Sequence, residues 1–401
     1  MGLLSVPGRG TVLGALERPA DLFRHLGPQW YAAVMGTAIV ANGADALPLS
    51  VPGLHSFALA VWALSLGMLS ALMAARAVHV SRHRDVWSAQ LLENPATAVF
   101  YGCPPMAMLS VGYGTLELGP EVLGTRAAVT LDAVLWSAGT LYALLVAFGV
   151  PCLMITRYRL EPHAADPTWL LPVVAPMVAA AFGPALVPHL PPGQPRETLL
   201  YGCYAMFGVS LLATLVLLPG IWSRLAGGAP SPAALTPTLF LVLGPLGQST
   251  TAVVRLAAVA REAAPEYATA MRAFAVLYGA PIMGFALLWL AVAATANMRA
   301  LRGGMGFAMT WWGFTFPVGT CVTGASGLER VTGLYALTGV AVLLYLLLVT
   351  AWAVAGFHTL RGAVSGRLFL PPAPPGVPAP APVPATAPSR RVRGSASRRG
   401  A

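Results

Sequence analysis

Hydrophobic residues in this chain gather into ten long apolar segments, separated by short stretches that hold most of the charged residues. Each segment has roughly twenty residues, the length that an α-helix needs to cross the hydrocarbon core of a bilayer. The segments run from Trp30 to Pro48, Leu54 to Val78, Thr97 to Leu116, Ala127 to Cys152, Trp169 to Leu190, Thr198 to Leu218, Leu235 to Ala257, Phe274 to Ala296, Phe307 to Gly327 and Gly333 to Phe357. The pattern predicts an all-α integral membrane protein with ten transmembrane helices.

Composition and charge support this interpretation and orient the chain. Of the 401 residues 57% are hydrophobic and 9% are charged, and the mean hydropathy is +0.70. All 24 basic residues are arginine, and 18 of them lie on one side if the N-terminus is cytoplasmic. Because cytoplasmic loops are enriched in basic residues, we predict an inner-membrane protein with both termini in the cytoplasm. The same rule explains the net charge of +10, so we predict a bilayer environment and no nucleic-acid partner.

Prolines recur at a regular interval within alternate apolar segments. Pro104, Pro176, Pro245 and Pro317 follow one another at steps of 72, 69 and 72 residues, and one further step back falls near Gly36. A proline inside a helix removes a hydrogen bond and bends it. We therefore expect five bent helices, each paired in a hairpin with a straighter helix, with Pro281 in the eighth segment as the exception. Five like units suggest a quasi-five-fold ring, with the bent helices facing a central pore and the straighter helices facing lipid.

Four strings give the chain a family resemblance. They are GPQWYAAVMGTAIVANG from Gly27, PTWLLPVVAPMVAAAFGP from Pro167, GPLGQS from Gly244 and TWWGFTFPVGT from Thr310. With them, residues 28 to 360 resemble the tellurite-resistance/dicarboxylate transporter family, which includes bacterial tellurite-resistance proteins, fungal malate and sulfite transporters and plant slow-type anion channels. The resemblance implies ten helices in five hairpins around a central pore, and a homo-trimer of separate pores.

The resemblance also implies a gate. In the family a phenylalanine on the ninth helix plugs the pore, and its position in FTFP corresponds to Phe316, with Phe314 as the fallback. An aromatic ring on a bent helix can close a narrow tube by contact and dewetting, although Phe316 could instead only pack against a neighbouring helix. The family keeps a small residue on the first helix near the constriction, which Gly36 matches, so a larger side chain there should block passage.

The residues that would select a substrate are less evident. No apolar segment has an arginine at its middle; Arg255, toward the outer end of the seventh, either attracts anions into an outer vestibule or extends to the lipid interface. Gln248 and Ser249 follow Pro245 and either hydrogen-bond a passing anion or join two helices. The residues expected to line the pore are Gly36, Pro104, Pro176, Pro245, Pro317, Gln248 and Ser249.

Ionisable residues in the apolar segments bear on two alternative functions. A proton-coupled carrier of C4-dicarboxylates such as malate, or of sulfite or tellurite, would need a titratable group in the membrane. Asp132 is the only acid clearly inside an apolar segment, and we expect it to pair with an outer arginine. The chain has no HExxH or aspartate-rich motif and no Ser, His and Asp set at one depth, so an enzyme is the remotest alternative. We predict no catalytic residue, metal or cofactor.

The sequence divides into three parts. Residues 1–27 form a cytoplasmic N-terminal segment, residues 28–360 form the membrane domain, and residues 361–401, rich in Pro, Ala and Arg, form a disordered cytoplasmic tail. The predicted function is passage of small anions such as chloride, nitrate, malate or sulfite through a pore gated by a phenylalanine, in a channel or facilitative transporter. The sequence does not choose among these anions.

Overall fold

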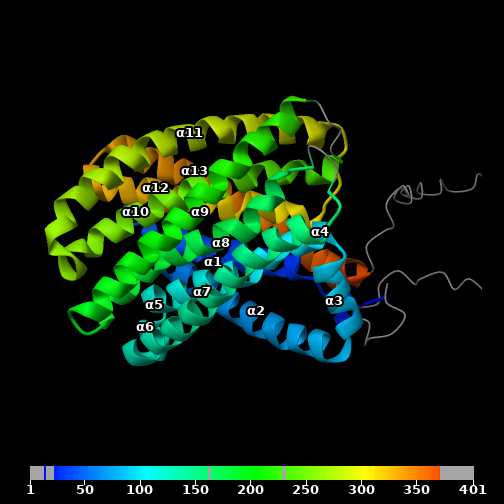
Figure 1. The fold of residues 1–401 in the computed structure, drawn as a ribbon, viewed down its shortest axis with the longest axis horizontal. Helices are drawn as coiled ribbons and strands as arrows, with labels where there is room; N and C mark the ends of the chain where they lie inside the picture. The colour runs from blue at the N-terminus through cyan, green and yellow to red at the C-terminus, as the bar shows by residue number, and fades with distance from the viewer. Residues whose placement is uncertain (1–12, 15–21, 161–163, 228–231, 371–401) are drawn as a thin grey trace, which may run out of the picture.

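The computed structural model describes residues 13–14, 22–160, 164–227 and 232–370, and all regular structure in them is helical. The all-α class is therefore confirmed. Each apolar segment coincides in large part with one long α-helix: α1 (Tyr31–Ala46), α2 (Leu54–Arg82), α5 (Cys103–Leu118), α7 (Thr125–Thr156), α8 (Leu170–Phe182), α9 (Gln194–Ala226), α10 (Leu243–Ala263), α11 (Ala268–Arg302), α12 (Phe316–Thr332) and α13 (Tyr335–Val364). Three short helices, α3 (Arg84–Leu92), α4 (Pro95–Ala98) and α6 (Pro120–Leu123), lie in the connections (Figure 1).

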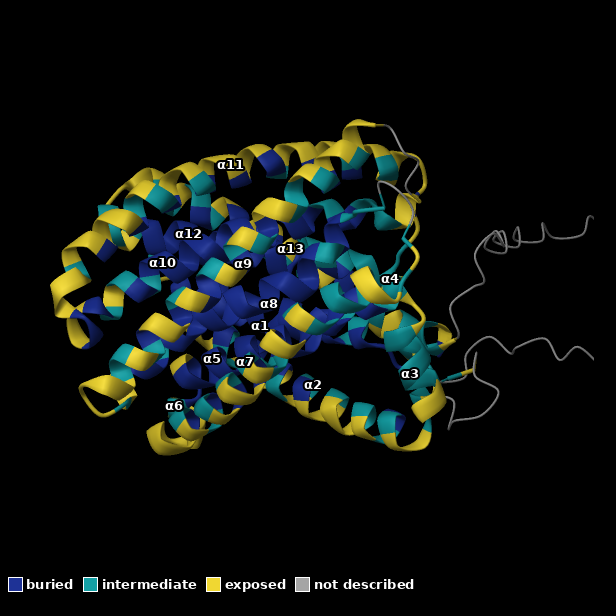
Figure 2. Ribbon diagram, viewed as in Figure 1, coloured by how far each residue is buried: buried dark blue, intermediate teal, exposed yellow. Residues whose placement is uncertain are grey.

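The ten helices form two concentric groups. The inner helices α1, α5, α8, α10 and α12 contact one another in that order, and α12 contacts α1, so the contacts close into a cycle. Each outer helix packs against two inner neighbours: α2 on α1 and α5, α7 on α5 and α8, α9 on α8 and α10, α11 on α10 and α12, and α13 on α12 and α1. Figure 2 shows the buried residues at the centre of the bundle and the exposed residues on the outer helices.

Burial separates the two groups quantitatively. In the spans that contain α8 and α10, 94% and 89% of the residues in an apolar 18-residue window are buried, against 22–28% in the corresponding windows of the five outer helices. An outer helix that leaves apolar side chains exposed is suited to contact with lipid tails. These seven spans are long and apolar enough to cross a membrane. The helices α1, α5 and α12 have only 16, 16 and 17 residues, so ten crossings remain a prediction.

A 3₁₀ helix precedes each inner α-helix. These are η2 (Pro28–Trp30), η3 (Val99–Gly102), η4 (Pro167–Trp169), η6 (Ala233–Val242) and η8 (Met309–Phe314). Such segments lengthen the inner elements, since a 3₁₀ helix rises about 2.0 Å per residue against about 1.5 Å in an α-helix. The inner elements are thus tighter at their starts and α-helical beyond them.

The periodic prolines take a different position from the one we expected. Pro104, Pro245 and Pro317 lie in the first turn of α5, α10 and α12, and only Pro176 lies within its α-helix. The prediction of interior bends is wrong for these three, because a first-turn proline removes an N–H that has no helical partner anyway.

The outer helices also differ from the prediction in their prolines. Besides Pro281 in α11, Pro151 lies inside α7 and Pro219 inside α9. The expectation that Pro281 is the exception among the outer helices is therefore wrong, because α7 and α9 continue beyond the ends of the apolar segments that predicted them.

The two ends of the described chain lie at the same end of the bundle. The backbone N–H of Leu13 donates to the Val364 carbonyl oxygen at 2.8 Å, and the rings of Trp30 and Phe369 stack with centroids 4.9 Å apart. The predicted tail boundary at 361 is wrong, because α13 continues to Val364 and a 3₁₀ turn, η9 (Arg367–Phe369), follows it. Residues 371–401 of the predicted tail lie outside the described residues.

Candidate pore and its two ends

A small cavity lies where the inner helices begin, and all five inner elements contribute to its wall. Its volume is about 20 Å³, room for roughly one water molecule. The lining side chains are mostly apolar: Met35 of α1, Met106 of α5, Leu170, Leu171 and Val174 of α8, Leu241 of η6, Gly244 of α10, and Phe316 and Pro317 of α12. A narrow apolar space on the axis of a helical ring excludes hydrated ions while it remains dry. We refer to it as the ring cavity.

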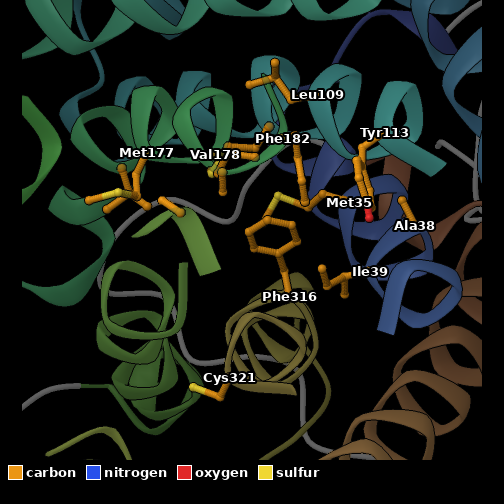
Figure 3. Packing of buried hydrophobic residues seen from close by; sticks show 14 of the residues in the cluster. Met35, Ala38, Ile39, Leu109, Tyr113, Met177, Val178, Phe182, Phe316 and Cys321 are labelled. Atoms are coloured by element: carbon orange, nitrogen blue, oxygen red, sulfur yellow. The ribbon is translucent and has the colours of Figure 1, made fainter. Parts of the chain in front are cut away.

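Phe316 is one wall of the ring cavity and is 2% exposed. It is the first residue of α12 and follows Thr315, which joins η8 to α12 with φ −98° and ψ −77°. In Figure 3 the Phe316 ring points away from α12 toward Met35 of α1. Its place at a junction between two helix types lets the side chain face the axis while α12 runs alongside α10.

Phe314, the fallback gate residue, has other surroundings. Its ring packs edge-on against Phe240 of η6 with centroids 4.9 Å apart, and against Trp311 at 5.8 Å. It does not line the ring cavity formed by the described residues. Of the two phenylalanines in FTFP, only Phe316 therefore borders the axis.

Gly36 lies against η8 instead of the ring cavity. A Cβ atom built at Gly36 would lie 2.7 Å from Cε3 of Trp312 and would also collide with the Thr315 hydroxyl. The cavity wall at this level of α1 is the neighbouring Met35. The small residue on the first helix thus gives η8 and the Thr315 junction room to approach α1.

Of the four periodic prolines expected to line the pore, one borders the ring cavity and three do not. Pro317 lines the ring cavity, whereas Pro104, Pro176 and Pro245 are buried in the inner helices without being among its lining residues in the described chain. The α10 wall is instead Gly244, next to Pro245.

One face of α10 connects the ring cavity to the opposite end of the ring. Gly244, Gln248 and Arg255 are separated by four and seven residues, so they share a face of the helix. Gln248 is 0% exposed, and neither its amide nitrogen nor its amide oxygen has a hydrogen-bond partner among the described residues. Ser249 donates to the Leu246 carbonyl oxygen at 3.0 Å and is satisfied within its own helix.

Arg255 points into the ring. Its guanidinium carbon lies 3.9 Å from the ring centroid of Tyr113 on α5 and 5.2 Å from that of Phe182 on α8. Those two rings stack with centroids 4.7 Å apart and are seen side by side in Figure 3. Because α5 and α8 are inner helices, a side chain of α10 that contacts both lies on the inner side of the ring. The Arg255 guanidinium group therefore packs among the inner helices and does not extend to the lipid interface.

Beyond Arg255 an arginine-lined cleft opens at the ends of α1, α10 and α12. Its volume is about 260 Å³, and its wall includes Arg255, Arg272 and Arg330. Arg272 and Arg330 each donate to a backbone carbonyl at 3.0 Å, and in the described part of the chain no carboxylate lies within 4.0 Å of any of the three guanidinium groups. Glu117 is near enough to Arg255 for electrostatic attraction. The cleft therefore presents guanidinium charge that no direct ion pair cancels.

Sequence reasoning found Arg255 but missed its aromatic partners and the other two arginines. Tyr113 and Phe182 come from the third and fifth apolar segments, so only the packed ring brings them to Arg255. Arg272 and Arg330 are among the six arginines that the charge distribution places at the outer side. The only signal in the sequence that could have placed these two arginines at the cleft is that each lies near the end of a predicted helix.

Asp132 of α7 also departs from expectation. It is 1% exposed, its Oδ2 atom has no hydrogen-bond partner, and no arginine of the described chain pairs with it. The prediction of an arginine partner is wrong, because the side chain lies against Gly112 of α5. A Cβ atom at Gly112 would lie 2.7 Å from Asp132 Oδ1.

These features define an integral membrane protein in which a buried ring of helices encloses a small central cavity, with an arginine-lined cleft at one end. The family model described as voltage-dependent anion channel matches residues 25–360, and the chain belongs to this family. The sulfite efflux pumps SSU1 of Arthroderma otae and Trichophyton rubrum are 28% and 29% identical over 313 residues, which cover 76% of this chain and 81% of each relative. An uncharacterized transporter of Methanocaldococcus jannaschii is 24% identical over 359 residues, covering 89% of this chain and 99% of the relative.

The family and its relatives confirm the sequence-based assignment to a family of anion channels and transporters. They also point away from an enzyme, since the relatives are a pump and transporters.

Proposed function

We propose that this protein lets small anions cross the membrane along the axis of the inner ring. The observation that carries the proposal is the ring cavity, because all five inner helices contribute to it and the arginine-lined cleft lies at the other end of the same ring. Unpaired guanidinium groups raise the local concentration of anions and repel cations. The apolar ring cavity then closes the path where the inner helices begin.

Phe316 is the gate in this proposal. Its ring and the side chains opposite leave space for about one water molecule, too little for a hydrated anion. A rotation of the ring about its side-chain bonds widens the cavity without moving α12, and wetting of the widened space lets an anion pass. Arg255 with Tyr113 and Phe182 narrows the axis a second time, nearer the cleft.

Sulfite is the first substrate to test, because similar proteins of two fungi are sulfite efflux pumps. Chloride, nitrate and malate are the next substrates to test, because the resemblance to the wider transporter family suggests them. The arginine distribution further predicts that the protein lies in the inner membrane with both termini in the cytoplasm. The family resemblance further predicts a homo-trimer.

The test is reconstitution of the whole chain into liposomes, with flux measured for sulfite, chloride, nitrate and malate. We expect at least one of the four to move faster than in empty liposomes and to do so without a pH gradient. Arg255→Gln should lower that flux, since it removes one of the charges that gather anions. Absence of flux for all four ions from a monodisperse preparation would overturn the proposal.

A proton-coupled carrier is the second candidate, and Asp132 is the observation that favours it. A buried carboxyl group with an unpaired oxygen is costly to ionise and is suited to bind and release a proton. This mechanism predicts that anion uptake requires an inward proton gradient and that Asp132→Asn abolishes the requirement. Flux that is equal with and without the gradient excludes it.

A further inference from the structure

Gln248 is a buried polar side chain whose hydrogen-bonding capacity is unused. Both ends of its carboxamide lack a partner among the described residues, and the residue is 0% exposed. The large majority of buried side-chain polar atoms in native proteins have at least one partner, and leaving one unpaired costs about 1–3 kcal/mol. An amide with both atoms unpaired on an inner helix therefore indicates a group that binds something not part of the chain.

Its position places this amide between the two narrow regions of the ring. With a rise of about 1.5 Å per residue, Gln248 lies about 6 Å beyond Gly244 and about 10 Å before Arg255 along α10. Gly244 borders the ring cavity, and Arg255 reaches the stacked Tyr113 and Phe182. The neighbouring face of α10 packs on α12, where Thr251 is hydrogen-bonded to Thr323 at 2.8 Å. Gln248 thus belongs to the face between that contact and α8.

We propose that the Gln248 carboxamide is a binding and selectivity site for small singly protonated oxyanions, an inference that rests on the proposed anion passage. The amide Nε2 donates a hydrogen bond to an anionic oxygen of the ligand, and Oε1 accepts one from its O–H group. Halides and fully ionised oxyanions can use only the donor and leave Oε1 unpaired. The recognition needs both ends of the amide, so it holds for either assignment of the nitrogen and oxygen atoms.

The Gln248 side chain is neutral, so it can select an ion without holding every anion tightly. Recognition through a hydrogen-bonded pair discriminates strongly against a ligand that lacks one member, because the partner group is then buried unpaired. A fixed arginine at this depth would instead hold any anion, and conduction requires that the ion also leaves. Arg255, about 10 Å further on, then supplies attraction without selection.

Bicarbonate and nitrate make a matched pair of probes, since both are planar oxyanions of one charge and only bicarbonate has an O–H group. The experiment is an inhibition assay on the reconstituted protein, with an anion that the wild type transports as the reporter. It measures the concentration of bicarbonate, and that of nitrate, at which the flux of the reporter anion is halved. We expect bicarbonate to be about ten-fold more potent than nitrate in the wild type, the equivalent of one additional hydrogen bond. In Gln248→Met, which keeps a long unbranched side chain without amide atoms, the two ions should be equally potent.

Ser249→Ala is the control, because the Ser249 hydroxyl is bonded within its own helix. It should keep the ten-fold preference. Equal potency of the two ions in the wild type, or a preference that survives in Gln248→Met, overturns the inference while the anion flux itself stands. If Gln248→Met does not fold, the wild-type comparison alone decides. Absence of any wild-type flux refutes the proposed function first, and this inference with it.

Discussion

Replacement of Phe316 by alanine tests the closure most directly. The perturbation removes an aromatic ring that is 2% exposed and forms one wall of a cavity of about 20 Å³. A buried aromatic side chain covers about 150–250 Å², so at about 25 cal/mol per Å² its burial sets an upper limit of about 4–6 kcal/mol on the preference for the closed state. A rotated ring still packs against the inner helices, and we take about half of this limit. The variant should therefore raise anion flux by about 30- to 150-fold.

The assay is anion flux from liposomes that contain equal amounts of folded protein. Phe314→Ala is the matched control, because Phe314 packs on Phe240 and Trp311 and does not line the described cavity. It should lower thermal stability without raising flux. Unchanged flux in a monodisperse Phe316→Ala protein, or an equal rise in both variants, would refute the assignment of the gate to Phe316.

Three further predictions concern the ring. Gly244→Ala adds a methyl group where no atom lies within 4 Å, so we expect a stable protein with several-fold slower anion flux. Gly247→Ala brings a Cβ atom within 2.5 Å of the α12 backbone and should cost about 1–3 kcal/mol of stability. Equal thermal unfolding temperatures of the two variants would contradict this expectation. Arg255→Gln should reduce flux about three- to ten-fold in dilute salt and less in concentrated salt, whereas a loss that ignores ionic strength would speak against attraction. Gly36→Val should collide with η8 and lower both stability and flux, while Gly67→Val, with no atom within 4 Å, should change neither.

The sequence predicted the helices and their two environments well, because both follow from local patterns. Twenty-residue apolar segments predict helices directly, and the proline period separated the five inner helices from the five outer ones. The bends were wrong because a proline period does not show where a 3₁₀ helix ends. In α12 the change falls between Phe314 and Phe316, so Pro317 begins an α-helix and does not kink one.

The candidate site was predictable only in part. Phe316 follows from a short motif in one segment, and the structure places it on the ring cavity. The group formed by Arg255, Tyr113 and Phe182 unites α10, α5 and α8, and no spacing in the sequence relates three helices that pack around an axis. For Gln248, a bond to another helix was a reasonable alternative from composition. Only the packed structure shows both amide atoms unpaired.

The distribution of charge along the axis explains how such a ring could select anions without binding them tightly. The ring cavity lies at the N-terminal ends of the inner helices, where the helix dipoles place partial positive charge. The opposite end holds three arginines without a direct carboxylate partner in the described chain. Between them, the face of α10 offers a neutral amide. In the proposed path an anion would be attracted by the arginines at one end and by the helix N-termini at the other, and it would meet no full charge at Gln248, which would keep its residence short. A lysine or arginine introduced at Gln248 should for this reason slow flux even though it strengthens binding.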